Sequence, residues 1–157
     1  MKRLLIMLGC FLLISMSIDA PPTHIEYKHS ESATITYPFG IEDTVLLSFI
    51  RLESNFNEKA VNPVTGARGI LQILPVMVAE ANRLQTIYGH STVYTWDDAW
   101  DAQRSIEMWY LVQEHHNPQY DLQKACQIWF GRGVQYDGMT WREYHQKIEN
   151  YLTFYST

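Results

Sequence analysis

Turn and breaker signals divide residues 41–157 into segments that have the features of α-helices. The breaks lie at Asn62-Pro63-Val64-Thr65-Gly66, at Gly89 to Asp98, at Asn117-Pro118 and at Gly131-Arg132-Gly133. Between them, apolar spacing and helix-end signals predict helices over residues 41–55, 75–84, 99–115, 122–130 and from 140 onward. No pair of strands is apparent in this region. The sequence therefore predicts a compact all-α domain of five helices.

Residue types at the helix ends support these bounds. Glu42 and Asp43 favour the first turn of the first helix, because acidic side chains stabilise the positive end of the helix dipole. Pro75 is tolerated in a first turn, and Thr140 with Glu143 forms a capping box. The side chains of the last helix that we expect to point inward are Trp141, Tyr144, Ile148, Tyr151 and Leu152.

Residues 1–20 have the layout of a secretory signal peptide. Lys2 and Arg3 precede the apolar run 4–14, which small and polar residues follow. The run is shorter than the roughly 20 apolar residues of a membrane-spanning helix. We therefore expect export to the periplasm or cell envelope, with no stable membrane span after cleavage.

Two other interpretations of this N-terminal segment stay open. Cys10 follows Leu8-Gly9, as in a lipoprotein cleavage site, and the segment could also be retained as an anchor. Residues 21–40 are rich in Pro, Ser and Thr and are expected to form an extended lead-in. Residues 41–157 then form a single domain.

The charge and the cysteine and histidine content exclude several classes of function. A net charge of −5 gives no basic face for nucleic acid. Cys126 is the only cysteine after the signal segment, so a buried thiol is the expectation. The six histidines show no metal-ligand spacing, and the adjacent His115 and His116 are interpreted as solvated. We predict no metal site and no cofactor.

One acidic side chain continues an apolar helical stripe. Glu53 lies four residues after Phe49 and three after Ile50, so it points toward the core or its rim. Burial disfavours the charged form and raises the pKa of a carboxyl, which suits a general acid. The alternative is a core glutamate that pairs with Arg51 or Arg68.

The residues around Glu53 form an extended motif. It consists of Glu53-Ser54-Asn55-Phe56-Asn57, then Ala60-Val61-Asn62-Pro63, then Gly66-Ala67-Arg68-Gly69-Ile70-Leu71-Gln72-Ile73-Leu74-Pro75. In spacing and residue type this stretch resembles the soluble lytic transglycosylase (SLT) domain family, which is lysozyme-like. The resemblance extends over roughly residues 40–152 and implies an α-rich lysozyme-like domain with a substrate cleft.

The resemblance also implies a reaction on peptidoglycan glycan strands. Glu53 would protonate the oxygen that links N-acetylmuramic acid (MurNAc) to N-acetylglucosamine (GlcNAc), with the muramyl acetamido group assisting departure. It would then act as base on the muramyl C6 hydroxyl, which attacks C1 and leaves a 1,6-anhydro end. A goose-type lysozyme, in which Asp97, Asp98 or Asp101 positions a water, is one alternative. A catalytically weak peptidoglycan-binding scaffold is another.

By the same resemblance we expect a set of substrate-binding residues, namely Ser54, Gln72, Leu74, Trp129, Phe130 and Tyr144. For three of them a structural role is also open. Ser54 could cap the end of the first helix, Trp129 could fill the core, and Tyr144 could serve mainly in core packing.

The chain departs from the family pattern downstream of the motif. Ser105 stands in place of Asn and Trp109 in place of Gly. Trp129 replaces the Tyr whose hydroxyl lies near the catalytic carboxyl in the family, and Phe130 replaces the Asn that follows it. Because an indole donates one hydrogen bond but accepts none, the group that would orient Glu53 is not identified by the resemblance.

The sequence does not select one physiological process. Local wall opening for a wall-spanning secretion or conjugation apparatus, wall turnover and phage entry all suit a one-domain enzyme of this kind. Such an apparatus is therefore a candidate partner, beside the glycan strands themselves.

Overall fold

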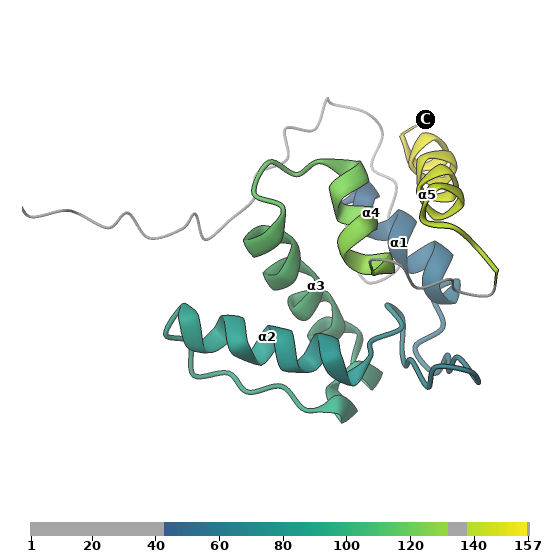
Figure 1. Ribbon diagram of the computed structural model, residues 1–157. Helices are drawn as coiled ribbons and strands as arrows, with labels where there is room; N and C mark the ends of the chain where they lie inside the picture. Colours follow the sequence, from purple (N-terminus) through teal and green to yellow (C-terminus); the bar gives the residue numbers. More distant parts are fainter. Residues whose placement is uncertain (1–42, 132–137, 157) are drawn as a thin grey trace, which may run out of the picture. The chain divides into compact units, whose positions relative to one another are not determined.

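The computed structural model describes residues 43–131 and 138–156 (Figure 1). Several sequence predictions concern residues outside these ranges: the signal segment with Cys10, the lead-in 21–40, residues 41 and 42 of the first helix, and the break at Arg132-Gly133.

The described part of the chain is all-α, as predicted. Its helices are α1 (Thr44–Ser54), α2 (Pro75–Ile87), the 3₁₀ helix η2 (Trp96–Trp100), α3 (Ala102–His116), α4 (Leu122–Phe130) and α5 (Trp141–Tyr155). The described ranges contain no β-strand, only isolated β-bridges between single residues. None of the helices there has the length and apolarity to cross a membrane.

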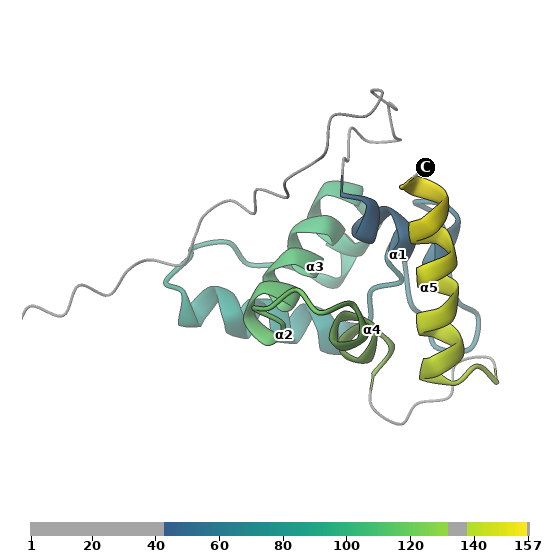
Figure 2. The same ribbon diagram turned by 90° about the horizontal axis from the view of Figure 1, so that it is seen from above.

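Figures 1 and 2 show how the helices pack. α1 lies against α5, α2 against α3, and α4 against both α3 and α5. The residues buried at the centre of this packing are large and apolar, and include Leu46, Phe49, Ile50, Ile70, Leu71, Ile73, Met108, Val112 and Ile148. Cys126 is a buried free thiol, as expected.

The helix ends differ from the predicted ones where a capping side chain intervenes. α1 begins at Thr44, because the carboxylate of Asp43 accepts hydrogen bonds from the main chain of Val45 and Leu46 and so precedes the first turn. α3 begins at Ala102, because Asp101 caps it in the same way. The residues before Asp101 form the separate helix η2, with its own capping box of Thr95 and Asp98.

The remaining helices follow the sequence signals more closely. α2 ends at Ile87, three residues beyond the predicted end, and Gly89 with a φ of 70° follows it. The bounds of α4 agree with the prediction, and the capping box of Thr140 and Glu143 at the start of α5 is confirmed. Of the expected inward residues of α5, Tyr144 and Ile148 are buried, whereas Trp141, Tyr151 and Leu152 are half-buried.

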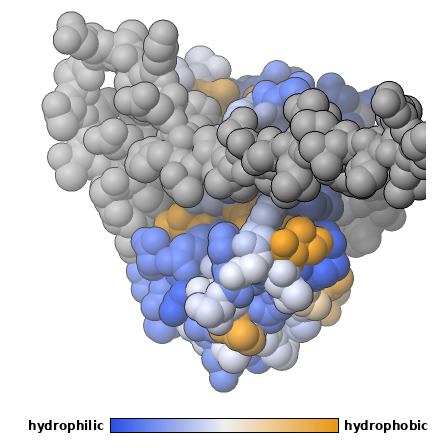
Figure 3. All heavy atoms as spheres, turned by 90° about the vertical axis from the view of Figure 1, so that its left-hand side faces the viewer, coloured by the Kyte–Doolittle hydropathy of each residue, from blue (hydrophilic) through white to orange (hydrophobic). Residues whose placement is uncertain are grey.

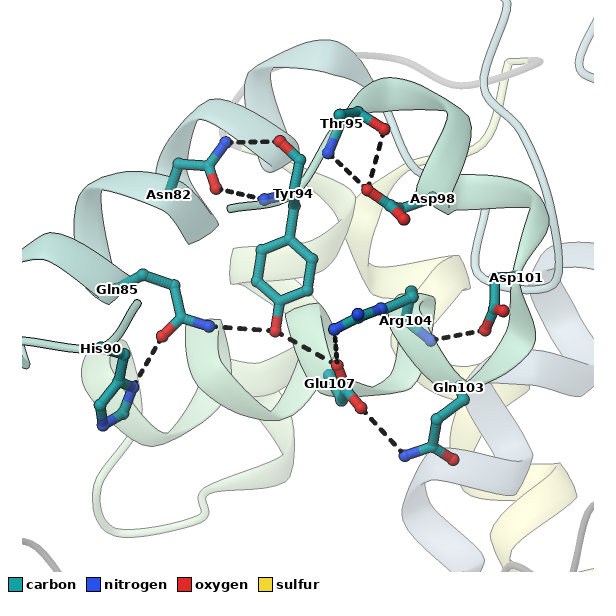
Figure 4. A network of polar contacts seen from close by, with 10 residues as sticks. All are labelled: Asn82, Gln85, His90, Tyr94, Thr95, Asp98, Asp101, Gln103, Arg104 and Glu107. Carbon is teal, nitrogen blue, oxygen red and sulfur yellow. Dashed lines mark hydrogen bonds and ion pairs between the residues drawn. The ribbon is translucent and has the colours of Figure 1, made fainter. Parts of the chain in front are cut away.

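A polar network fixes α2 to α3 through the segment before η2 (Figure 4). The amide of Asn82 forms two hydrogen bonds with the main chain of Tyr94, 2.8 Å and 2.7 Å long. The Tyr94 hydroxyl accepts from Gln85 on α2 and donates to Glu107 on α3. Because Tyr94 is buried, these contacts hold α2 in place as a wall of the domain.

Figure 3 shows the side of the described domain on which α2 ends. The described surface visible there is mostly hydrophilic, with a few separate hydrophobic groups. Two apolar side chains at and just after the end of α2 are exposed, namely Ile87 at 54% and Val93 at 76%. Scattered exposed apolar side chains of this kind are ordinary for a protein surface.

The loop between α1 and α2 is held close to η2 by a glycine. Gly69 has a φ of 74°, and a Cβ added to it would lie 1.8 Å from the carbonyl oxygen of Ala99. Ser105 is fully buried and donates to that same oxygen over 3.2 Å. This contact gives Ser105, which departs from the family pattern, a structural role.

We predict that Gly69→Ala destabilises the fold much more than Gly66→Ala. Both glycines have φ near 75°, but a Cβ at Gly66 would meet nothing within 4 Å. The control variant Gly66→Ala should therefore lose only the conformational cost of about 1–2 kcal/mol. Gly69→Ala adds a clash with main chain and should lose roughly 3–5 kcal/mol. Urea unfolding of both variants measures this, and equal losses would contradict the close contact.

Candidate active site

Glu53, in the last turn of α1, lines a pocket of about 700 Å³. The pocket wall includes residues from α1, α2, α3, α4, α5 and the loop between α1 and α2. A volume of this size is typical of cavities that hold a small-molecule ligand. Glu53 therefore lies neither in a closed core nor on a convex surface.

The carboxyl of Glu53 is held by a tyrosine from the far end of the chain. The hydroxyl of Tyr144 on α5 donates a hydrogen bond of 2.5 Å to Oε1 of Glu53. The ring of Tyr144 is 5% exposed and packs against Phe49, with ring centroids 6.0 Å apart, and against Phe130, at 5.2 Å. Packing on both rings fixes the phenol, so Tyr144 combines core packing with a polar contact in the pocket.

Burial raises the pKa of Glu53 to about 7, and the hydrogen bond from Tyr144 partly opposes this rise. Neither arginine considered from the sequence pairs with the carboxyl. Arg51 lies over the ring of Tyr151, and Arg68 lies 3.5 Å from the ring centroid of Trp96 and pairs with Asp97. Among the described residues, Glu53 therefore does not form the salt bridge with Arg51 or Arg68 that was the alternative interpretation of the sequence.

Gln72 lines the pocket in a conformation that is uncommon for a non-glycine residue, with a φ of 50°. Its side-chain NH₂ donates to the carbonyl oxygens of Gly69, over 2.9 Å, and of Ala60, over 3.3 Å. Because carbonyls only accept, these bonds fix which end of the amide is nitrogen. The amide oxygen of Gln72 accepts no hydrogen bond from a described residue and is available to a ligand.

The other predicted substrate-binding residues of the motif separate into two groups. Leu74, the residue before α2, lines the pocket. Ser54 does not: its hydroxyl donates to the carbonyl of Ile50, four residues back in α1, over 3.4 Å. This hydrogen bond lies within α1, and the residue that caps the end of the helix is Asn55, so the bond does not support the capping role considered for Ser54.

Trp129 and Phe130, at the end of α4, both line the pocket. The indole N–H of Trp129 donates to the main-chain oxygen of Leu71 over 3.3 Å, so it ties α4 to the loop between α1 and α2. Phe130 is 7% exposed and supports the ring of Tyr144. The indole of Trp129 thus binds the loop between α1 and α2, and the hydroxyl beside Glu53 comes from Tyr144 on α5.

Three titratable residues of the pocket were not identified as site residues from the sequence, namely Glu80, His116 and Lys124. Glu80 on α2 accepts two hydrogen bonds of 2.7 Å from Arg83 and one of 2.6 Å from Nε2 of His116. The Arg83 hydrogen bond, with a smaller contribution from His116, lowers the pKa of Glu80 to about 2.

The Glu80–Arg83 pair has a spacing that could be recognised on one helix. The contact of Glu80 with His116 could not, because the two residues are 36 positions apart on different helices. His116 is exposed, in line with the solvated interpretation, but it also lines the pocket. The same interpretation was wrong for His115, which is half-buried and hydrogen-bonded through Nδ1 to the hydroxyl of Tyr88 over 2.9 Å.

The three aspartates considered as water-positioning groups have other contacts. Asp97 pairs with Arg68, Asp98 belongs to the capping box of η2, and Asp101 caps α3. None of the three lines the pocket that holds Glu53.

Comparison with known proteins identifies the family. The model of the transglycosylase SLT domain matches residues 32–125, a span that contains Glu53, Gln72 and Leu74 and ends before α4 is complete. No curated protein matches the chain, and no solved structure matches it. The match covers more than half of the sequence, and lytic transglycosylase activity on peptidoglycan is what this family implies. The chain therefore belongs to the transglycosylase SLT domain family.

Proposed function

We propose that this protein is a peptidoglycan lytic transglycosylase that cleaves the MurNAc-β-1,4-GlcNAc bond and leaves a 1,6-anhydroMurNAc end. The observation that carries the proposal is the carboxyl of Glu53, which lines a pocket, has a pKa of about 7 and is held by Tyr144. Such a group is partly protonated near neutral pH and is able both to donate and to accept a proton.

In the first step Glu53 donates its proton to the glycosidic oxygen, and the bond between that oxygen and muramyl C1 breaks. The hydrogen bond from Tyr144 occupies Oε1, so Oε2 is free to carry the proton. The acetamido group of the same sugar stabilises C1 as the GlcNAc unit departs, which makes a second enzymic carboxylate unnecessary.

In the second step the Glu53 carboxylate accepts the proton of the muramyl C6 hydroxyl, and the C6 oxygen bonds to C1. The carboxyl is then protonated again and ready for the next turnover. Because nucleophile and electrophile belong to one held sugar, the entropic cost of bringing them together is small.

Hydrolysis by a goose-type lysozyme mechanism has less support. It needs a carboxylate or polar group to position and activate a water. Glu80 lines the same pocket, but its oxygens accept from Arg83 and His116, and a carboxylate with a pKa of about 2 is a poor base.

A binding scaffold without activity also has less support. The departures Trp129 and Phe130 leave Glu53 with a hydroxyl donor, because Tyr144 supplies one. A scaffold would have no need of a carboxyl whose pKa burial raises to about 7, since such burial costs stability.

We further propose export to the periplasm or cell envelope, on the basis of the sequence of residues 1–20. The glycan strands are then within reach. A wall-spanning secretion or conjugation apparatus remains a candidate partner, and a pull-down of the exported protein from envelope extracts tests it.

We predict that Glu53→Gln lowers glycan cleavage at least about 100-fold, because general acid and base catalysis by one group is typically worth that much or more. Glu58→Gln is the control, since Glu58 is a nearby glutamate that does not line the pocket. Turbidity loss of purified sacculi measures the rate, and mass spectrometry identifies the products. Anhydro ends support the proposal, reducing muramic ends support hydrolysis, and equal rates for wild type and Glu53→Gln support a scaffold.

The pH profile should report on the contact between Glu53 and Tyr144. Because the protonated acid starts the reaction, kcat/KM of the wild type should fall as the pH rises through about 7. Tyr144→Phe removes the hydrogen bond that lowers the pKa, so the fall should move to higher pH, with kcat reduced by about tenfold or more.

Tyr110→Phe is a matched control for that experiment, since the Tyr110 hydroxyl donates to the carboxylate of Asp43 and Tyr110 does not line the pocket. Its profile should follow that of the wild type. A profile of Tyr144→Phe that moves to lower pH, or does not move, would contradict the assignment of the titrating group.

Stability should depend on pH through the same carboxyl. The folded protein holds the Glu53 proton more tightly than the unfolded chain, so this group lowers stability as the pH rises from about 4.5 to about 7. Glu53→Gln removes the effect and should therefore be more stable than the wild type at pH 8, with the gain absent at pH 4. Thermal unfolding at both values measures this, and a less stable variant at pH 8 would refute the raised pKa.

A further inference from the structure

The titratable residues of the pocket lining come from two sets of helices. Glu53 and Tyr144 come from α1 and α5, whereas Glu80, His116 and Lys124 come from α2, α3 and α4. In both ribbon views α4 lies between α2 and α5 (Figures 1 and 2). The two groups thus come from different helices that line the same pocket.

The charges of this second group do not cancel. Arg83 binds Glu80 through two hydrogen bonds of 2.7 Å, so the negative charge of Glu80 is already compensated by a residue outside the pocket lining. Lys124 forms no ion pair with any described residue, although it lines a pocket whose wall is otherwise largely apolar. An excess positive charge beside apolar surface favours an anionic ligand.

The hydrogen-bond pattern assigns the N–H of His116 to Glu80. Ionised Glu80 only accepts, so Nε2 of His116 must carry the hydrogen in their 2.6 Å contact. That N–H is therefore not available to a ligand, and Glu80 and Arg83 hold the imidazole in place. The charged donor that remains in this part of the pocket lining is Lys124 on α4.

We propose that Lys124 binds a carboxylate of the glycan strand while Glu53 acts on the glycosidic bond. This inference rests on the proposed function for its substrate. Two sources of the carboxylate exist in peptidoglycan: the lactyl group of a muramyl residue without its peptide, and the peptide stem where it is attached. Lys124 would then determine which strands the enzyme prefers.

Binding to a catalytically blocked protein tests the proposal independently of the reaction. Isothermal titration of the full exported chain with Glu53→Gln compares three ligands of equal glycan length: fragments with peptide stems, fragments freed of stems by an amidase, and chitin oligosaccharides, which have no carboxylate. Adding Lys124→Gln should weaken binding of carboxylate-bearing ligands by about tenfold and leave chitin binding unchanged. Lys59→Gln, an exposed lysine outside the pocket, is the matched control and should change nothing.

The pattern of losses identifies the source of the carboxylate. A loss confined to fragments with stems assigns Lys124 to the stem, and a loss confined to fragments without stems assigns it to the lactyl group. Equal losses for all three ligands, or no loss for any, would overturn the subsite. The proposed function fails on a different result, namely the absence of glycan cleavage by the wild-type enzyme.

Discussion

The contact between Glu53 and Tyr144 joins the two ends of the domain. The two residues are 91 positions apart, and their hydrogen bond connects the last turn of α1 to the first turns of α5. It forms only when α1 and α5 pack side by side, because Phe49 and Phe130 must both contact the tyrosine ring. The chemistry of the pocket therefore depends on completion of the whole helical packing, not on the motif around Glu53 alone.

Local signals in the sequence were sufficient to predict the helices and to place Glu53 at the core or its rim, and the resemblance to the SLT family was needed to make it the catalytic candidate. The capping box at Thr140, the proline at the start of α2 and the position of Glu53 on an apolar stripe all act within a few residues. Helix ends that are set by a capping side chain were predicted less well. Asp101 caps the start of α3, so the residues before it form the separate helix η2, and helical periodicity alone does not reveal this division. The N-terminal signal segment stays a prediction, since it lies outside the described residues.

The pairing of residues across helices could not be predicted from one sequence. The resemblance to the SLT family directed attention to the position of Trp129 for the hydroxyl beside Glu53, whereas Tyr144 provides it. The contact between Glu80 and His116 was not predicted either, because helix packing and not proximity along the chain brings the two residues together. Ser54 shows the converse: a residue inside the motif has a local bond to Ile50 and does not line the pocket.

The approach of Gly69 to the carbonyl of Ala99 has a mechanical consequence. Two main-chain segments touch there with no side chain between them, so no rotamer change is able to absorb a relative displacement. The loop that includes Gln72 should therefore move together with helix η2 as one rigid unit. Adaptation of the pocket to bulkier ligands then has to come from flexible side chains of its lining, such as Met77 and Met139.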